Sequence, residues 1–316
     1  MAQGIYGVWT EVDFDRDGKQ FSRLRTTYSD TRAAYGAIEI PIVVVRNGSG
    51  PSVLLMAGNH GDEYEGQVTL SRLARELEPA DIEGCVIIMP AANAPAAMAG
   101  TRRSPIDNGN LNQSFPGRAD GTPTEQISDY IETQLLPRVQ YWVDLHSGGS
   151  SMDMLPSVSI HMSGDSGLDA RNMAALRAFG GEIAVCYQFQ NERAASSAAQ
   201  RHGVSYLYGE FGGGGDVDPV GVAITREGTL RLLAHVGVLR RSAKFVPRAA
   251  PPMRLLQVDY RDYLYNRRHY VFADHAGLFE HGGLAGVSLD DGNPLIEELA
   301  QQGRSAGHLD CHDRLA

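Results

Sequence analysis

Cysteine is scarce in this sequence, and its spacing argues against two kinds of site. The chain of 316 residues has three cysteines, Cys85, Cys186 and Cys311, and no two of them are close together. An odd number of distant cysteines suggests neither a disulfide framework nor the paired thiolates of a structural zinc site. We therefore expect buried or incidental thiols, because a free cysteine usually behaves as a small apolar side chain.

Positive charge is also in short supply. The chain has 38 acidic and 28 basic side chains, which gives a formal net charge of -10. No basic cluster is longer than the pairs Arg240–Arg241 and Arg267–Arg268. Nucleic-acid-binding proteins normally carry a basic patch or stripe. We therefore expect no nucleic-acid partner.

Long hydrophobic runs are missing as well. Residues 1–10 lack the basic flank and the continuous apolar stretch of a signal peptide, and no later segment approaches the length of a membrane span. We expect a cytoplasmic protein without a membrane partner. Apolar residues make up 42% of the chain, which is enough for one large core and a smaller module.

Short apolar runs alternate with segments of helical periodicity between residues 50 and 240. Continuous apolarity over four to six residues is typical of strands that are buried on both faces. The predicted strands are 53–56, 85–89, 141–145, 183–186 and 205–210, and the predicted helices are 66–77, 123–135, 170–179 and 219–239. This order predicts an α/β fold with a largely parallel sheet covered on both faces. Ligands bind such sheets at the carboxyl ends of the strands.

The two ends of the chain depart from this alternation. The first forty-odd residues read as extended and edge-like, ending in residues 37–45. After Lys244, three prolines mark a linker, and strands are expected at 253–258 and 269–273 without helices between them. We predict a main domain over residues 1–245 and a small β-rich C-terminal module over residues 246–316, with an irregular tail.

A histidine and a glutamate follow the first buried strand directly. His60 and Glu63, in Gly58–Asn–His–Gly–Asp–Glu63, are three positions apart at the start of a helix and can point the same way. An imidazole nitrogen beside a carboxylate oxygen suits zinc, and catalytic zinc has three such ligands with a fourth position open to water. Pairs with this spacing also arise by chance, so the pair alone indicates little.

A second histidine, His146, lies at the end of another predicted strand. Alone it would be interpreted as a hydrogen-bonded core residue, but together with His60 and Glu63 it completes a set of two histidines and one carboxylate. Asp144 shares a strand face with His146 and could support it as a hydrogen-bond acceptor, although a carboxylate satisfied by backbone amides is the alternative. We predict one divalent ion, zinc first, since these ligands also accept manganese or cobalt.

Glu210 ends a further predicted strand and is followed by the glycine run Gly212–Gly215. A carboxylate near a zinc-bound water can take its proton as the water attacks a carbonyl, and can then protonate the leaving amine. The alternative is a helix-cap or surface carboxylate. The glycines indicate either a close approach of backbone to a ligand or a flexible loop. They lack the Lys–Ser/Thr pair of a phosphate-binding loop, so we expect no nucleotide.

A long polar loop lies between the predicted metal-binding strands. It contains the pair Arg102 and Arg103, followed by a turn-rich stretch over residues 108–117. Arginine suits carboxylates and polarised carbonyls through its fork of donors. A solvated loop charge is the alternative, and it is the stronger reading for one of the two arginines.

In their order along the chain, these motifs resemble the succinylglutamate desuccinylase/aspartoacylase family, which is related to zinc carboxypeptidases. The matching residues are Gly58–Asn–His–Gly–Asp–Glu63, Asn93–Ala–Pro95, Arg102, Leu111–Asn112, Phe115–Pro–Gly117, Asp144–Leu–His146 and Gly209–Glu210. The resemblance implies a three-layer α/β/α hydrolase domain with one zinc ion held by His60, Glu63 and His146. It also implies Glu210 as the base and Arg102 as the group that polarises the scissile carbonyl.

One position departs from the family's pattern. The family usually has Asn–Arg where this chain has Asn112–Gln113, and that arginine normally holds the carboxylate of the substrate. A neutral glutamine forms no charged fork, so either Arg103 or Arg118 substitutes for it or the substrate differs. We predict Arg103, Asn112 and Gln113 as substrate-binding residues.

Residues 104–112 look most like the branch of the family that deacetylates N-acetyl-2,4-diaminobutyrate in ectoine breakdown. The leading hypothesis is therefore hydrolysis of the amide bond of a small N-acyl amino acid. A desuccinylase or aspartoacylase would need a further cationic group for the acyl carboxylate, and Gln113 disfavours a carboxypeptidase. A metal-dependent binding protein without catalysis is the alternative from another class, and Glu210 argues against it. Whether the chain forms a homo-oligomer is left open.

Overall fold

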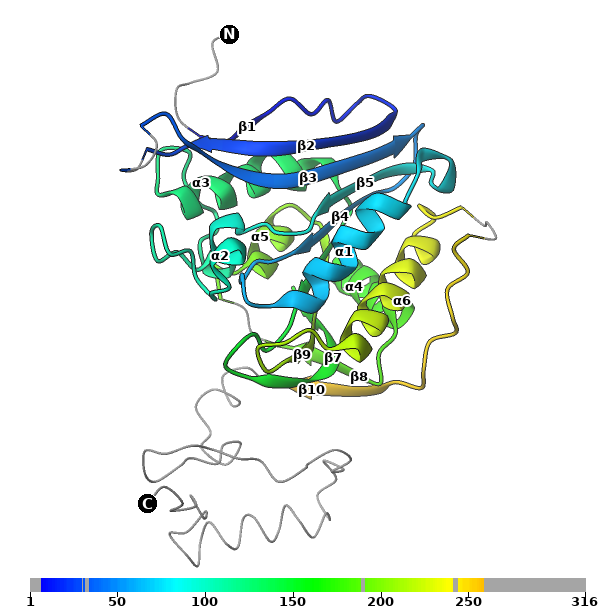
Figure 1. Ribbon diagram of the computed structural model, residues 1–316. Coiled ribbons are helices and arrows are strands. Elements are labelled where there is room, and N and C mark those ends of the chain that lie inside the picture. The colour runs from blue at the N-terminus through cyan, green and yellow to red at the C-terminus, as the bar shows by residue number, and fades with distance from the viewer. Residues whose placement is uncertain (1–6, 30, 32–33, 189–190, 241–243, 259–316) are drawn as a thin grey trace, which may run out of the picture. The chain divides into compact units, whose positions relative to one another are not determined.

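The computed structural model describes residues 7–29, 31, 34–188, 191–240 and 244–258. In these residues, ten strands form one sheet in the order β1-β2-β3-β5-β4-β6-β9-β7-β8-β10 (Figure 1). The strands are β1 (Trp9–Thr10), β2 (Gly18–Thr27), β3 (Ala37–Asn47), β4 (Ser52–Ala57), β5 (Gly84–Met89), β6 (Tyr141–His146), β7 (Asp153–His161), β8 (Ile183–Tyr187), β9 (Ser205–Gly213) and β10 (Arg254–Val258). The α-helices are α1 (Tyr64–Glu76), α2 (Ala94–Ala99), α3 (Pro123–Tyr130), α4 (Ser166–Phe179), α5 (Ala195–Arg201) and α6 (Pro219–His235).

Helices cover both faces of the sheet, and each face has its own hydrophobic core. Val53 and Leu55 of β4 pack with residues of α1, α4 and α6, whereas Leu54 and Met56 pack with residues of α3 and α5. Both faces of β4 are therefore buried, which explains why its sequence is apolar without alternation. The predicted α/β fold, with helices on the two faces of a mixed, largely parallel sheet, is confirmed.

Strands β5, β4, β6 and β9 lie side by side and run parallel. Their carboxyl ends therefore meet at one edge of the sheet, where the loops after β4, β6 and β9 are brought together. On either side of these four strands the direction reverses: β3 pairs antiparallel with β5, and β7 pairs antiparallel with β9. The extended N-terminal region becomes the antiparallel pair of β2 and β3 at one side of the sheet.

Strand β7 was not predicted, and its proline explains why. Pro156 lies in the middle of the strand, where the pairing with β9 shifts register between Met154 and Ser157. Proline is tolerated in sheets mainly at such irregularities, because it cannot donate a ladder hydrogen bond. The short helices α2 and α5 were also not predicted.

Only part of the predicted C-terminal module lies in the described residues. Residues 254–258 form β10, which pairs in parallel with β8 at the edge of the main sheet. The second predicted strand, 269–273, and the predicted tail lie outside the described residues. The division between residues 1–245 and 246–316 therefore stays a prediction.

The cysteines and the helices bear on two expectations from the sequence. Cys85 and Cys186 are free and buried, as expected, and Cys311 lies outside the described residues. Among the helices that the structure describes, none has the length and apolarity that crossing a membrane would require.

Candidate metal centre

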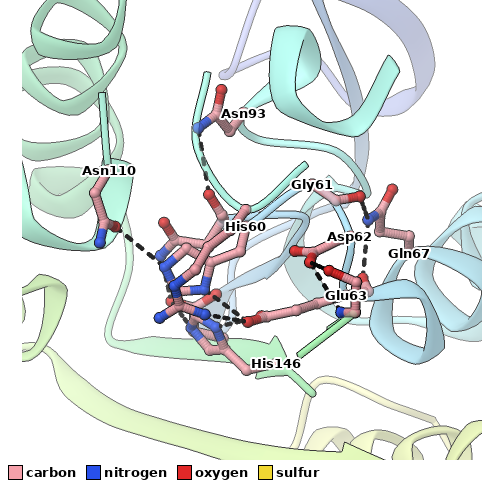
Figure 2. Close-up of polar contacts among 12 residues, drawn as sticks. His60, Gly61, Asp62, Glu63, Gln67, Asn93, Asn110 and His146 are labelled. Carbon is pink, nitrogen blue, oxygen red and sulfur yellow. Dashed lines mark hydrogen bonds and ion pairs between the residues drawn. The ribbon is translucent and has the colours of Figure 1, made fainter. Parts of the chain in front are cut away.

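The turn between β4 and α1 points His60 and Glu63 in one direction (Figure 2). Gly58 has a φ of 67°, and a Cβ atom at Gly61 would lie 1.9 Å from the carbonyl carbon of Ala96. Glycine is needed at both positions, for the left-handed backbone at one and for the close approach to α2 at the other. From the first turn of α1, Gln67 donates from Nε2 to the carbonyl oxygens of Gly61 and Glu63, at 2.9 Å and 2.8 Å.

The three predicted ligands converge on the carboxylate of Glu63. Nδ1 of His60 lies 2.7 Å from Oε1 of Glu63, and Nδ1 of His146 lies 2.8 Å from Oε2. All three side chains are buried, and one ligand atom from each lies within 4.8 Å of the others. Two imidazole nitrogens and one carboxylate oxygen at this spacing fit the donor set of a catalytic zinc site.

The charges in this group also suit a cation. Burial would raise the pKa of Glu63, but the neighbouring His146 and His60 outweigh burial and lower this pKa to about 2. The same interactions act on His146, whose pKa lies well above its usual value because Asp144 and Glu63 outweigh the effect of burial. Glu63 is therefore an anion at neutral pH, and a metal ion would replace the proton that the histidine holds.

Each of the two histidines is held at its Nε2 atom by a second side chain. Nε2 of His146 lies 3.0 Å from Oδ2 of Asp144, as the shared strand face predicted. Nε2 of His60 lies 3.1 Å from Oδ1 of Asn110. Such outer partners fix the ring orientation and the tautomer of a metal-binding histidine. Asn110 belongs to the polar loop identified in the sequence, but spacing alone did not distinguish it from Asn108 or Asn112.

Asp144 is completely buried and holds more than the histidine. Its Oδ2 accepts hydrogen bonds from Nδ2 of Asn59, at 3.1 Å, and from the hydroxyl of Tyr206, at 3.0 Å. Side-chain donors therefore satisfy this oxygen of Asp144. The alternative, in which backbone amides satisfy the carboxylate, does not hold for Oδ2. No local sequence pattern assigned these roles to Asn59 or Tyr206.

Glu210 lies directly beside His146. The two residues are paired across β6 and β9, and in a parallel pair such residues project on the same face of the sheet. Burial is the main cause that raises the pKa of Glu210, and the charge of Glu63 adds to it, while His146 and Arg102 lower this pKa; the net result is a pKa of about 8. A carboxyl group with a pKa near neutrality can both accept and donate a proton at physiological pH.

The arginine pair of the polar loop is divided between two environments. Nη1 of Arg102 lies 3.2 Å from Oε1 of Glu63, and 44% of its side chain is exposed, so this arginine reaches the ligand cluster from the solvent side. Arg103 and Gln113 are exposed, and Asn112 is half-buried. Within the described residues, no side-chain hydrogen bond or ion pair joins any of these three to His60, Glu63 or His146.

The glycine run after Glu210 lies against the loop that follows His146. The N–H of Gly148 donates to the carbonyl of Gly212 at 2.8 Å, and the N–H of Gly215 donates to the carbonyl of Gly149 at 2.9 Å. A Cβ atom at Gly213 would lie 2.2 Å from the carbonyl oxygen of Met152. The glycine run therefore approaches the loop after His146 closely. These contacts join the segment after Glu210 to the segment after His146.

Asp62 fastens the same loop to the turn that carries His60 and Glu63. Its buried Oδ2 accepts hydrogen bonds from the N–H and the hydroxyl of Ser150, at 2.9 Å and 2.7 Å. The carboxylate passes so close to Gly149 that a Cβ atom there would lie 2.7 Å from Oδ2. The segments that carry the ligands and Glu210 thus form one hydrogen-bonded unit.

Comparisons with known proteins show which family this chain resembles. A sequence model described as the succinylglutamate desuccinylase/aspartoacylase catalytic domain matches residues 49–236. The N-alpha-acetyl-L-2,4-diaminobutyric acid deacetylase of Halomonas elongata is 39% identical over 270 residues, covering 85% of this chain and 76% of that protein.

Two solved structures are similar over most of their length. The product-bound ectoine utilization protein EutE (DoeB) of Ruegeria pomeroyi has a TM-score of 0.79 and 37% identity, covering 87% of this chain and 81% of that chain. A succinylglutamate desuccinylase/aspartoacylase of Rhodobacter sphaeroides has a TM-score of 0.76 and 39% identity, covering 86% and 80%.

Proposed function

This chain belongs to the succinylglutamate desuccinylase/aspartoacylase family, and we propose that it is a zinc-dependent deacetylase of N-alpha-acetyl-L-2,4-diaminobutyrate. The observation that carries the proposal is the convergence of two Nδ1 atoms on the Glu63 carboxylate, with Glu210 on the neighbouring strand. The choice of substrate is supported by the similarity to the Halomonas elongata deacetylase and to the ectoine utilization protein.

In this proposal His60, Glu63 and His146 hold one zinc ion. When bound, zinc would lower the pKa of a water molecule and polarise the amide carbonyl. Glu210 accepts a proton from the attacking water at a carboxylate oxygen and delivers it to the nitrogen of the leaving amine. Its pKa of about 8 would fall beside a cation, so that more of the carboxyl group is ionised near neutral pH and available to accept a proton.

Arg102 has the position to stabilise the carbonyl oxygen as negative charge develops on it. Its side chain already reaches Oε1 of Glu63 and is partly exposed, so it can turn to a substrate that enters from solvent. A guanidinium donates charge-assisted hydrogen bonds, which are stronger than neutral ones. Arg103, Asn112 and Gln113 remain proposed substrate-binding residues of the same loop; Arg103 and Gln113 are exposed, and Asn112 is half-buried.

The test is release of free amine from a panel of N-acetyl, N-succinyl and N-formyl amino acids. The protein is assayed as purified, after chelation and after zinc is restored. We expect the highest turnover with N-acetyl-diaminobutyrate, loss of turnover on chelation and recovery with zinc. Preference for an N-succinyl substrate would replace the deacetylase by a desuccinylase.

The variant Glu210→Gln distinguishes an enzyme from a metal-dependent binding protein. We expect it to bind one zinc ion per chain, as wild type does, and to lose turnover by about a hundredfold or more. Zinc content measured on the same sample shows that the metal site is intact. Unchanged turnover in this variant would remove Glu210 from the mechanism.

A further inference from the structure

A cavity lies at the far end of α6 from the metal centre. The first turn of α6 packs on the segment after Glu210, since a Cβ atom at Gly221 would lie 2.1 Å from the carbonyl oxygen of Phe211. The last turn of α6, with His235, lines a cavity of about 930 Å³ together with the end of α4 and residues 245–250. Figure 1 shows the segment after α6 running alongside that helix towards β10. None of the proposed catalytic or metal-binding residues lines this cavity.

The polar lining of the cavity is cationic. Among the described residues, no carboxylate lines it. The lining includes four arginines and one histidine, which are Arg177, Arg231, Arg240, Arg248 and His235. Arg177 belongs to α4, whereas the other four belong to α6 and the residues that follow it, so only the fold brings Arg177 to this group. In a chain with a formal net charge of -10, such a concentration of positive charge requires a physical reason.

One of the four arginines has a structural role that accounts for its position. Arg231 donates from Nε and Nη2 to the carbonyl oxygens of Phe179 and Gly180, at 2.7 Å and 2.8 Å. It thereby satisfies carbonyl groups at the end of α4, where a cation also interacts favourably with the helix dipole. Arg240 is only weakly paired, with its Nε 3.9 Å from Oε2 of Glu83.

The other two arginines have no such role. Arg177 and Arg248 are exposed, and within the described residues no hydrogen bond or ion pair to either guanidinium is found. Oε2 of Glu227 accepts the backbone N–H of Arg248 at 2.9 Å. Two guanidinium groups are therefore available at the rim of the cavity.

The floor of the cavity is apolar. Leu239 and Phe245 line it and are themselves almost fully buried, and Val246 beside them is exposed. A ligand that matches these surfaces combines a charged head for the arginine forks with an apolar body for the floor.

We propose that this cavity binds a small organic dianion, a phosphate ester or a dicarboxylate, with its head on Arg177 and Arg248 and its apolar body on Phe245 and Leu239. Guanidinium groups bind both kinds of head through paired N–H donors, so the two share one recognition chemistry. The site is separate from the metal centre and does not depend on the proposed deacetylase activity.

The test is isothermal titration calorimetry of the full, zinc-loaded chain at physiological ionic strength. The probes are phenyl phosphate and phthalate, with inorganic phosphate as the head group without a body. We expect one saturable site for at least one of the two organic dianions and weaker binding of inorganic phosphate. Saturation by phenyl phosphate alone identifies a phosphate ester as the preferred class, and saturation by phthalate alone identifies a dicarboxylate.

Two double variants provide the comparison. Arg177→Gln/Arg248→Gln should lose about tenfold or more in affinity for the organic dianion, whereas Arg16→Gln/Arg72→Gln, with the same change in net charge on other exposed surfaces, should bind as wild type. A His60→Ala variant, which lacks a metal ligand, should keep the site. The proposal is overturned if wild type shows no saturable binding at millimolar concentrations, if both double variants lose affinity equally, or if His60→Ala abolishes binding.

Discussion

At the scale of single residues, Asp144 holds Nε2 of His146. Three donors meet on its Oδ2, and the carboxylate is fully buried. We predict that Asp144→Asn weakens zinc binding by about ten- to a hundredfold, because the outer nitrogen of His146 loses a charged acceptor. Affinity is measured by competition with a chromophoric chelator. Tyr206→Phe removes another bond to the same oxygen but leaves His146 its partner, so it should lower the affinity much less.

Asp107 is a second residue with a measurable charge effect, away from the metal ligands. It accepts hydrogen bonds from the N–H and hydroxyl of Thr124, at 2.7 Å and 2.8 Å, and from the N–H of Gly109. Burial would raise its pKa, but these hydrogen bonds lower it below the usual value. The depressed pKa means that Asp107 stabilises the fold above the pKa of the unfolded chain, and that this stabilisation is lost as the pH falls through the folded pKa.

We therefore predict a pH-dependent effect of Asp107→Asn on the free energy of unfolding. At about pH 7 the variant should be less stable by roughly 1–2 kcal/mol, because a neutral amide accepts more weakly than a carboxylate. Below about pH 4, the usual pKa of an aspartate, the difference should shrink, because the unfolded chain then binds a proton that folded Asp107 takes up only at lower pH. Urea unfolding at several pH values measures it. A difference that is constant with pH would show that the charge of Asp107 is unimportant.

At the scale of elements, three loops at the carboxyl edge of the sheet act as one unit. Gly149 lies at their junction, with a φ of 61° and no room for a Cβ atom beside the carboxylate of Asp62. We predict that Gly149→Ala lowers both the free energy of unfolding and the zinc affinity, because the loop after His146 must move away from the turn that carries Glu63. The first effect is measured by urea unfolding and the second by chelator competition.

Gly48 provides a matched control for that substitution. It has a φ of 65°, but a Cβ atom there would meet nothing within 4 Å. Gly48→Ala should therefore carry only the cost of the left-handed backbone, about 1–2 kcal/mol, and leave zinc affinity unchanged. Equal effects of the two substitutions would mean that crowding at Gly149 does not position the metal ligands.

At the scale of the whole molecule, the proposed ligands come from neighbouring strands of the central sheet. His60 and Glu63 follow β4, and His146 ends β6, which pairs with it. An ion that binds the folded chain stabilises it by mass action, by about 4 kcal/mol at a thousandfold excess over Kd. We predict that chelation lowers the midpoint of thermal unfolding and that added zinc restores it. The His60→Ala variant should show a much smaller response to zinc, and an equal response would point to another site.

The sequence by itself determined the features that depend on local spacing. Each strand or helix was recognised from the spacing of apolar residues within a single segment. The alternation of strands and helices then predicted the parallel sheet. The three-residue spacing of His60 and Glu63, and the position of His146 and Glu210 at strand ends, indicated the ligand cluster because parallel strands end at one edge. Strand β7 escaped this reasoning because Pro156 interrupts its pattern at a register shift.

Only the tertiary structure decided which further residues meet this cluster and which residues form the cavity. The selection of Asn110 for His60 and of Tyr206 for Asp144 depends on how a loop and a neighbouring strand pack, and several asparagines and tyrosines in the sequence were equivalent candidates. The cationic cavity brings together arginines from α4, α6 and the segments that follow α6. Contacts of this kind follow from the packing of complete layers, in which many weak interactions act together, and no local pattern records them.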